Sequence, residues 1–256
     1  MWNTIIINPM FNALLGIYSL LGSFGIAIIL FTILVRLLTH PLTASQLRST
    51  QAMQDMQKSK KYMDMQKKYK DDKQKLQEEQ MKMYQEMGVN PLGSCLPLLI
   101  QFPVIIGLYR AIILALPVTP LQLVGISEHL YPFFDIAKLI PIENTFLWMD
   151  LNQPERLTIF GIGIPVLAIL VAITTFLQSK LMTPTAQPGD QGAQMGQAMT
   201  MYMPLLMGYL AYSFASGLAL YFITTNLVTI GQYVAMGKIT LSSLKNLIPG
   251  AKKGAD

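Results

Sequence analysis

Long apolar runs without a single charged residue set the pattern along this chain. They cover residues 1–35, 89–109, 157–179 and 191–237. A helix needs about 20 consecutive apolar residues to cross the hydrocarbon core of a bilayer. The last run is long enough for two such helices, and the small residues of Ser213–Gly217 mark the turn between them. The pattern therefore predicts a chain that crosses a membrane several times.

The apolar runs predict helices rather than strands. They lack the two-residue alternation of barrel strands, and lipid admits only helices or closed barrels as spanning structures. The predicted fold is an all-α polytopic membrane protein with five transmembrane helices. The fourth is short, because its apolar part would reach only about 21 Å against a hydrocarbon core of about 30 Å, which predicts local thinning of the bilayer. The five expected helices are Gly16–Leu38, Leu96–Leu116, Leu157–Leu181, Met199–Tyr212 and Ser216–Met236.

Polar segments between the spans complete the expected division of the chain. The first residues, broken by Asn8-Pro9 and Asn12, favour a short helix at the membrane interface. The segment after the first span favours a cytoplasmic helical hairpin. The expected parts are an interfacial segment 1–15, a first span 16–41, the hairpin 42–88, a second span 89–117, an extracytoplasmic loop 118–156, a third span 157–181, a cytoplasmic loop 182–198, the fourth and fifth spans 199–236, and a basic cytoplasmic tail 237–256.

Composition and charge agree with a membrane protein and orient the chain. Charged residues make up 13% of the sequence, whereas soluble domains carry about 25%. An excess of Lys and Arg marks cytoplasmic loops. Segment 42–88 holds ten of them, segment 117–156 holds only Lys138 and Arg156, and the tail 237–256 holds four lysines. We therefore expect the N-terminus outside and the C-terminus in the cytoplasm.

The hairpin segment 42–88 is rich in Gln, Lys, Met and Glu, which are good helix formers. Asp71-Asp72 is the expected turn, and Gly88 is expected to end the second helix. The apolar face is thin, which predicts a mobile arm. Two interpretations remain open: a solvated spacer, or a docking arm for a partner or nascent chain that uses adaptable methionines. The residues expected to carry docking are Tyr62, Met65 and Tyr69, spaced i, i+3 and i+7.

Two ionisable side chains, Arg36 and Arg110, fall inside the expected spans. A charge at that depth costs about 2.5–3.5 kcal/mol on insertion scales and marks a functional candidate. No Asp or Glu lies in any of the five spans, so the sequence offers Arg36 no intramembrane counter-ion. Water, lipid phosphate or a group from outside the chain could compensate its charge, or the side chain could snorkel to the interface. Arg110 is expected to snorkel outward or to cap carbonyls.

Polar residues form one stripe on each of four expected spans, in their cytoplasmic halves. Residues three and four apart share a helix face, so stripes turned toward each other would line a wet groove open to the cytoplasm. The alternative is that Ser and Thr bond their own backbone or hold helices together. The stripes comprise Thr32, Arg36 and Thr39; Ser94, Pro97 and Gln101; Thr174 and Gln178; and Thr225, Asn226, Thr229 and Gln232.

Other kinds of chemistry find little support in these residues. The single cysteine, Cys95, can form no disulfide within the chain and, alone, no metal site. A channel or transporter would carry polar residues through the full membrane depth, often with inverted repeats; the stripes stop before the outer half. An intramembrane hydrolase would have only Ser216 as nucleophile, with His40 and His129 outside the span cores. We expect no enzyme activity, metal or cofactor.

Four longer motifs occur in order along the chain. They are ILVRLLTHPLT (33–43), NPLGSCLPLLIQFPVIIGLYRAI (90–112), FLWMDLNQPE (146–155) and ASGLALYFITTNLVTIGQ (215–232). In order and spacing they resemble the YidC / Oxa / Albino family of membrane protein insertases. The form GLYRAI is similar to that of the chloroplast and cyanobacterial branch.

This resemblance implies a five-helix core around a positively charged groove. Arg36 falls on the family's groove arginine and Gln101 and Gln178 on lining positions, while Phe222 stands where many members have tryptophan and leaves an aromatic wall. It implies an insertase and chaperone that moves nascent membrane proteins from the cytoplasm into the lipid bilayer, without nucleotide hydrolysis or nucleic-acid specificity. The expected partners are ribosomes, targeting factors and the Sec translocon. The expected location is the plasma membrane of a bacterium, or a thylakoid-type membrane.

Overall fold

The fold is described from a computed structural model. It describes residues 2–69, 72–88, 96–116, 126, 129–132, 142–159, 162–182 and 191–237. Several expected features lie outside these residues: Asp71, Ser94, most of the loop before residue 142, the middle of the loop 182–198, and the tail from residue 238 onward.

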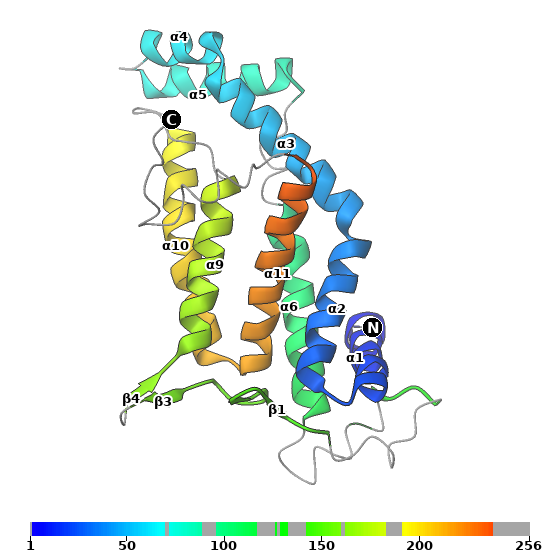
Figure 1. The fold of residues 1–256 in the computed structure, drawn as a ribbon. Helices are drawn as coiled ribbons and strands as arrows, with labels where there is room; N and C mark the ends of the chain where they lie inside the picture. The colour runs from blue at the N-terminus through cyan, green and yellow to red at the C-terminus, as the bar shows by residue number, and fades with distance from the viewer. Residues whose placement is uncertain are drawn as a thin grey trace.

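Five apolar helices run side by side and form the body of the molecule (Figure 1). They are α2 (Phe24–Leu38), α6 (Leu96–Ala115), α9 (Val166–Met182), α10 (Gln191–Ser213) and α11 (Ser216–Ala235). Helix α11 contacts each of the other four, and most of its side chains are buried. It therefore forms the centre of the hydrophobic core. Among the expected spans, Ser216–Met236 agrees with α11 to within one residue.

The continuous helix expected over Gly16–Leu38 is wrong. A π-helix η1 (Asn3–Ile7) and helix α1 (Asn8–Leu21) come first, and α1 ends at Gly22, which has a φ of 69°. Glycine adopts this left-handed conformation without a Cβ clash, so a Gly-Ser pair breaks the apolar run. Figure 1 shows α1 nearly end-on, so it lies across the bundle, where it contacts α2 and α6.

The helix expected from Leu157 also begins later than predicted. Strands β3 (Leu157–Ile159) and β4 (Ile162–Ile164) pair as an antiparallel hairpin before α9 begins at Val166. The sequence carries Gly161, Gly163 and Pro165 here. Glycine and proline disfavour a helix interior, and proline is well tolerated next to a helix start. A second short hairpin pairs β1 (Thr145–Phe146) with β2 (Met149–Asp150).

Helix α10 is longer than the expected fourth span. It begins at Gln191, inside the expected cytoplasmic loop 182–198, because Gln, Ala and Met sustain a helix although they are not strongly apolar. Its 23 residues reach about 34 Å. The helix as a whole is thus long enough for a hydrocarbon core of about 30 Å, and the expected mismatch holds only for its apolar part.

Two helices of the described chain are long and apolar enough to cross a membrane by length and composition. They are Asn3–Leu21, with a mean hydropathy of 1.5, and Ser216–Ala235, with 1.3. Phe24–Leu38, Gln101–Ala115 and Val166–Leu181 are shorter apolar helices. This helical, apolar architecture agrees with an all-α membrane protein.

The hairpin segment forms three helices at one end of the bundle (Figure 1). They are α3 (His40–Lys58), α4 (Lys60–Lys68) and α5 (Lys73–Glu86). Ser59 ends α3 and caps α4 by accepting a hydrogen bond from the Tyr62 amide, a break that the composition did not reveal. Asp72 caps α5 at the expected turn. Gly88, with a φ of 64°, follows the end of α5 as predicted.

Helices α4 and α5 pack against each other through a small core to which α3 contributes Met56. Met56, Tyr62 and Met83 are buried together. The Tyr62 hydroxyl accepts a hydrogen bond from Gln80 Nε2 at 3.1 Å, and both side chains are buried. The apolar face is therefore narrow, as expected, but it packs around a satisfied polar pair.

Hydrogen bonds to backbone carbonyls connect the elements at the opposite end of the bundle. The amide of Gly217 donates to the carbonyl of Leu151 at 3.0 Å, and Asn152 Nδ2 donates to the carbonyl of Leu116 at 2.8 Å. The segment after β2 is thereby fixed to the start of α11 and the end of α6. A Cβ at Gly217 would stand 3.1 Å from the Leu151 carbonyl oxygen and 3.2 Å from Ile28 Cδ1. Glycine permits this close approach.

We predict that Gly217→Ala destabilises the protein by about 1–3 kcal/mol, because backbone must move to admit a methyl group. Gly231→Ala in the same helix is the matched control, since nothing lies within 4 Å of its Cβ position. Thermal unfolding in detergent should show a lower Tm for Gly217→Ala and an unchanged or slightly higher one for Gly231→Ala. Equal Tm values for the two variants would contradict the close approach.

Candidate functional site

Arg36 lies in the last turn of α2, at the end of the bundle that carries the hairpin. Its side chain is half-buried, and Nη2 lies 3.4 Å from Oε1 of Gln101 on α6. The ion pairs within the described residues are Lys61–Glu86 and Lys82–Glu79, and Arg36 takes part in neither. Its described side-chain partner is thus a neutral amide.

Two residues of α11 complete this contact. Gln101 Nε2 donates to the hydroxyl of Tyr221 at 2.5 Å. Gln232 Nε2 donates to the backbone carbonyl of Arg36 at 3.2 Å, and its Oε1 is buried without a hydrogen-bond partner among the described atoms. The expected residues Arg36, Gln101 and Gln232 therefore meet, and they bring α2, α6 and α11 together.

The sequence interpretation missed Tyr221. It lies four residues before Thr225, and so one turn further along the polar stripe of α11. Extending the stripe by that turn would have included it. Instead the neighbouring Phe222 was singled out as an aromatic wall. Phe222 is buried in the hydrophobic core, with its ring centroid 5.7 Å from that of Tyr221.

A second polar contact joins α9 and α11. Asn226 Nδ2 donates to the hydroxyl of Thr174 at 3.0 Å and to that of Thr175 at 2.9 Å. Gln178 lies one turn after Thr174 on α9 and is half-buried. The expected stripes of these two helices therefore face each other at Asn226.

Two threonines of the stripes donate hydrogen bonds to backbone carbonyls of their own helix, which is the alternative to lining a groove. Thr32 is 0% exposed and donates to the carbonyl of Ile28 at 2.6 Å. Thr229 is buried and donates to the carbonyl of Thr225 at 2.7 Å. Thr225 is itself buried. Thr32 and Thr229 therefore bond their own helix. The half-buried members of the stripes are Arg36, Thr39, Gln101, Thr174 and Gln178.

The remaining candidates lie in other surroundings. Ser216 is fully buried, and its hydroxyl donates to the carbonyl of Asp150 at 2.5 Å. His129 Nδ1 lies 2.9 Å from Asn8 Oδ1. Arg110 is exposed on α6. Across the part of the chain that the structure describes, no group of three or more His, Cys, Asp or Glu is placed to hold a metal ion.

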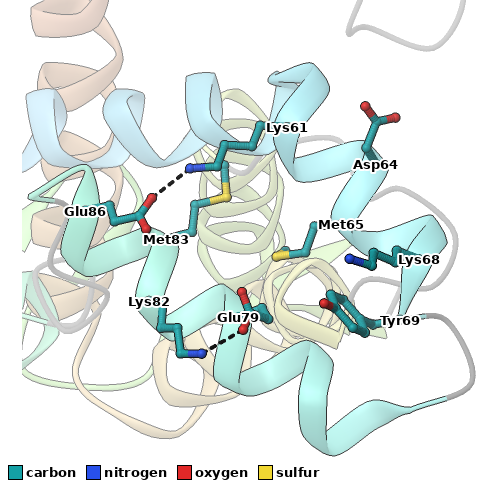
Figure 2. A pocket seen from close by; sticks show the side chains of 9 residues that line it. All are labelled: Lys61, Asp64, Met65, Lys68, Tyr69, Glu79, Lys82, Met83 and Glu86. Atoms are coloured by element: carbon teal, nitrogen blue, oxygen red, sulfur yellow. Dashed lines mark hydrogen bonds and ion pairs between the residues drawn. The ribbon is translucent and has the colours of Figure 1, made fainter.

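A cavity of about 240 Å³ lies between α4 and α5 of the hairpin (Figure 2). Met65, Tyr69 and Met83 provide its apolar surface, whereas Tyr62 is 1% exposed and faces the hairpin core. Lys61 and Glu86 form an ion pair at 2.7 Å on one rim, and Lys82 and Glu79 form another at 2.7 Å. The remaining lining residues are Asp64 and Lys68.

The second ion pair shifts the pKa of both its partners. The hydrogen bond from Lys82 holds the pKa of Glu79 below its ordinary value, and Glu79 raises the pKa of Lys82. Both shifts favour the charged forms. The cavity is thus bordered by charges of both signs above an apolar surface, with three lysines balanced by three acids.

Comparison with known proteins extends over most of the chain. The family described as 60Kd inner membrane protein matches residues 16–243. The membrane protein insertase YidC of Oceanobacillus iheyensis is 36% identical over 248 residues, which are 93% of this chain and 84% of that protein. The membrane protein insertase MisCA of Bacillus subtilis is 36% identical over 237 residues, which are 90% of this chain and 77% of that protein.

The match also covers part of a longer relative. The membrane protein insertase YidC of Pelobacter propionicus is 32% identical over 243 residues, and the chain spans 39% of its length. The two shorter relatives are covered by more than two thirds, and the family match includes α2 through α11. This chain belongs to the 60Kd inner membrane protein family, which is the YidC / Oxa / Albino family that its four motifs resemble.

Proposed function

We propose that this protein is a membrane protein insertase and chaperone, which moves substrate proteins from the cytoplasm into the lipid bilayer. The names of its relatives support the insertase function. The finer proposal is a route along a positively charged hydrophilic groove formed by α2, α6, α9 and α11, without nucleotide hydrolysis. The bilayer of the bacterial plasma membrane is the proposed location.

The observation that carries this proposal is the environment of Arg36. A charge within a membrane span is unfavourable by about 2.5–3.5 kcal/mol. The described partner of its guanidinium is the neutral amide of Gln101, which does not cancel the charge, and the side chain is half-buried. The positive charge is thus left to attract an acidic or polar substrate segment.

We further propose five transmembrane helices, with the N-terminus outside and the C-terminus in the cytoplasm. Helices α2, α6, α9, α10 and α11 are the proposed spans. Helix α1 crosses the bundle in Figure 1 and suits a position at the outer interface. The lysine-rich hairpin then lies in the cytoplasm, in keeping with the bias of Lys and Arg toward that side.

Hydrophobic burial supplies the driving force in this proposal. A substrate's polar leading segment enters near Arg36, while its apolar segment moves along the lipid-facing side of α9 and α11. Ile173, Phe176 and Leu227 are exposed apolar residues on these two helices. Each buried CH₂ of the substrate contributes about 0.8 kcal/mol on leaving water. A complete span therefore needs no nucleotide to favour insertion.

Arg36→Ala is predicted to slow insertion of a substrate with an acidic leading segment by about tenfold or more, because a hydrogen bond to a charged group contributes about 1.5–3 kcal/mol. Arg36→Lys should retain part of the rate. Insertion into proteoliposomes, scored by protease protection, measures the effect. Neutralising the substrate's acids should reduce its dependence on Arg36.

The exposed Arg110 provides the matched control for that measurement. Arg110→Ala should leave the preference for the acidic substrate unchanged. If Arg36→Ala and Arg36→Lys both insert the acidic substrate at the wild-type rate, the attraction mechanism is wrong for this protein.

The hairpin is proposed as the docking arm for nascent chains and for the ribosome, targeting factors or Sec translocon. Its cavity supports this interpretation over that of a plain spacer. The volume of about 240 Å³ lies below that of small-molecule sites, which is about 300–1,000 Å³. It suits one or two apolar side chains of a protein partner. Met65 and Tyr69 are accessible to such a partner, whereas Tyr62 maintains the hairpin.

Replacing Met65 and Tyr69 together by Ser should lower co-translational insertion about fivefold or more, since anchor residues of an interface each contribute more than about 1 kcal/mol. The buried cluster of Met56, Tyr62 and Met83 stays intact, so helix content by circular dichroism should not change. Lys67→Ser, an exposed change on α4 outside the cavity, is the control. Equal insertion by all three proteins would favour the spacer interpretation.

A further inference from the structure

Tyr221 is the one member of the Arg36 contact that the polar pattern did not predict. It is 3% exposed, on the central helix α11. Its hydroxyl lies 2.5 Å from Gln101 Nε2. A buried phenol usually finds a hydrogen-bond partner, and here the partner is the same amide that meets Arg36.

The chemistry of the guanidinium fixes the direction of these bonds. Arginine has five N–H donors and no acceptor. Gln101 must therefore turn Oε1 toward Arg36, as the 3.4 Å contact shows, and its NH₂ group away from it. A Gln101 turned the other way would set donor against donor. The acceptor that holds the NH₂ group in place is the Tyr221 hydroxyl.

The amide contacts Arg36 on α2 through Oε1 and Tyr221 on α11 through Nε2. Tyr221 is thus the described acceptor for its NH₂ group. Gln101 is half-buried and close to the start of α6, where water could otherwise compete for either end of the amide. Removing the phenol oxygen would free the amide to rotate. A rotated amide would repel the guanidinium rather than accept from it.

We propose that Tyr221 is a positioning residue, which acts through Gln101 to hold the Arg36 guanidinium where an incoming acidic segment meets it. This inference rests on the proposed function, because it concerns the same site. It assigns Tyr221 no contact with the substrate. The neighbouring Phe222 cannot play this role, because its side chain has no hydroxyl group.

Tyr221→Phe tests the proposal, because it removes one oxygen and keeps the ring. Insertion into proteoliposomes is measured for two reporters that differ only in an acidic or a neutralised leading segment. Tyr221→Phe should reduce the acidic-to-neutral rate ratio about three- to tenfold, the range expected for one hydrogen bond. The rate for the neutral reporter should stay unchanged. Tyr233→Phe, which removes another buried hydroxyl from α11, should keep the wild-type ratio.

A double-mutant cycle with Gln101→Met shows whether Tyr221 acts through Gln101. Gln101→Met keeps the side-chain length and removes both hydrogen bonds, so it alone should reduce the ratio as much as Tyr221→Phe. The double variant should be no worse than either single variant, because both remove one connection. Additive losses, or equal losses for both reporters, would overturn the positioning role and leave Tyr221 a packing residue.

Two outcomes separate this inference from the proposed function. If wild-type protein inserts neither reporter, the proposed function fails. If wild-type protein prefers the acidic reporter, and Tyr221→Phe and Gln101→Met both keep that preference, only the positioning role fails. Should Tyr221→Phe not fold, Gln101→Met alone decides, and an unchanged ratio there overturns the inference.

Discussion

A full positive charge near one end of an apolar helix bundle is the constraint on which this structure depends. Among the described residues the Arg36 guanidinium meets the amide of Gln101, and the described ion pairs do not include Arg36. A carboxylate at hydrogen-bond distance would stabilise the arginine but would also cancel its charge. Amides allow the guanidinium to stay ordered and still attract an anion. This choice of partners requires α6 and α11 to approach α2 at that point.

The two ends of the bundle are built differently as a consequence. At the end near the β-hairpins, Leu151, Asn152 and Ser216 exchange hydrogen bonds with backbone, and Gly217 allows close packing. At the hairpin end, side-chain amides make the contacts between helices. Contacts to backbone carbonyls fix the first end, whereas the amides of the hairpin end lie beside the half-buried Arg36. The hairpin end is the side from which substrates are proposed to arrive.

The sequence predicted which segments are apolar helices, but it did not predict where several of them begin. The predicted boundaries were wrong at Gly22 and Pro165. At these positions a glycine or a proline breaks the helix although the surrounding residues stay uncharged and apolar. The boundary at Gln191 was wrong for the opposite reason, since helix propensity extends α10 beyond its apolar part. Within the site, Arg36, Gln101 and Gln232 were found because charge and amides stand out in an apolar background. Tyr221 was missed because tyrosine counts as apolar in such patterns, while its hydroxyl decides the contact.

The hairpin is joined to the site through a short kink rather than a free linker. Helix α2 ends at Leu38 and α3 begins at His40, with Pro41 in its first turn. Thr39 lies between them, and its hydroxyl and amide both donate to the carbonyl of Val35. Proline removes one helical hydrogen bond and bends the axis there without ending the helical path. Arg36 is three residues before Thr39 and so lies about one turn from the junction of α2 and α3. Met65 and Tyr69 follow a second break, at Ser59, where the backbone is extended. The proposed docking arm and the proposed site of polar capture are therefore joined by two short helix junctions rather than by one rigid helix.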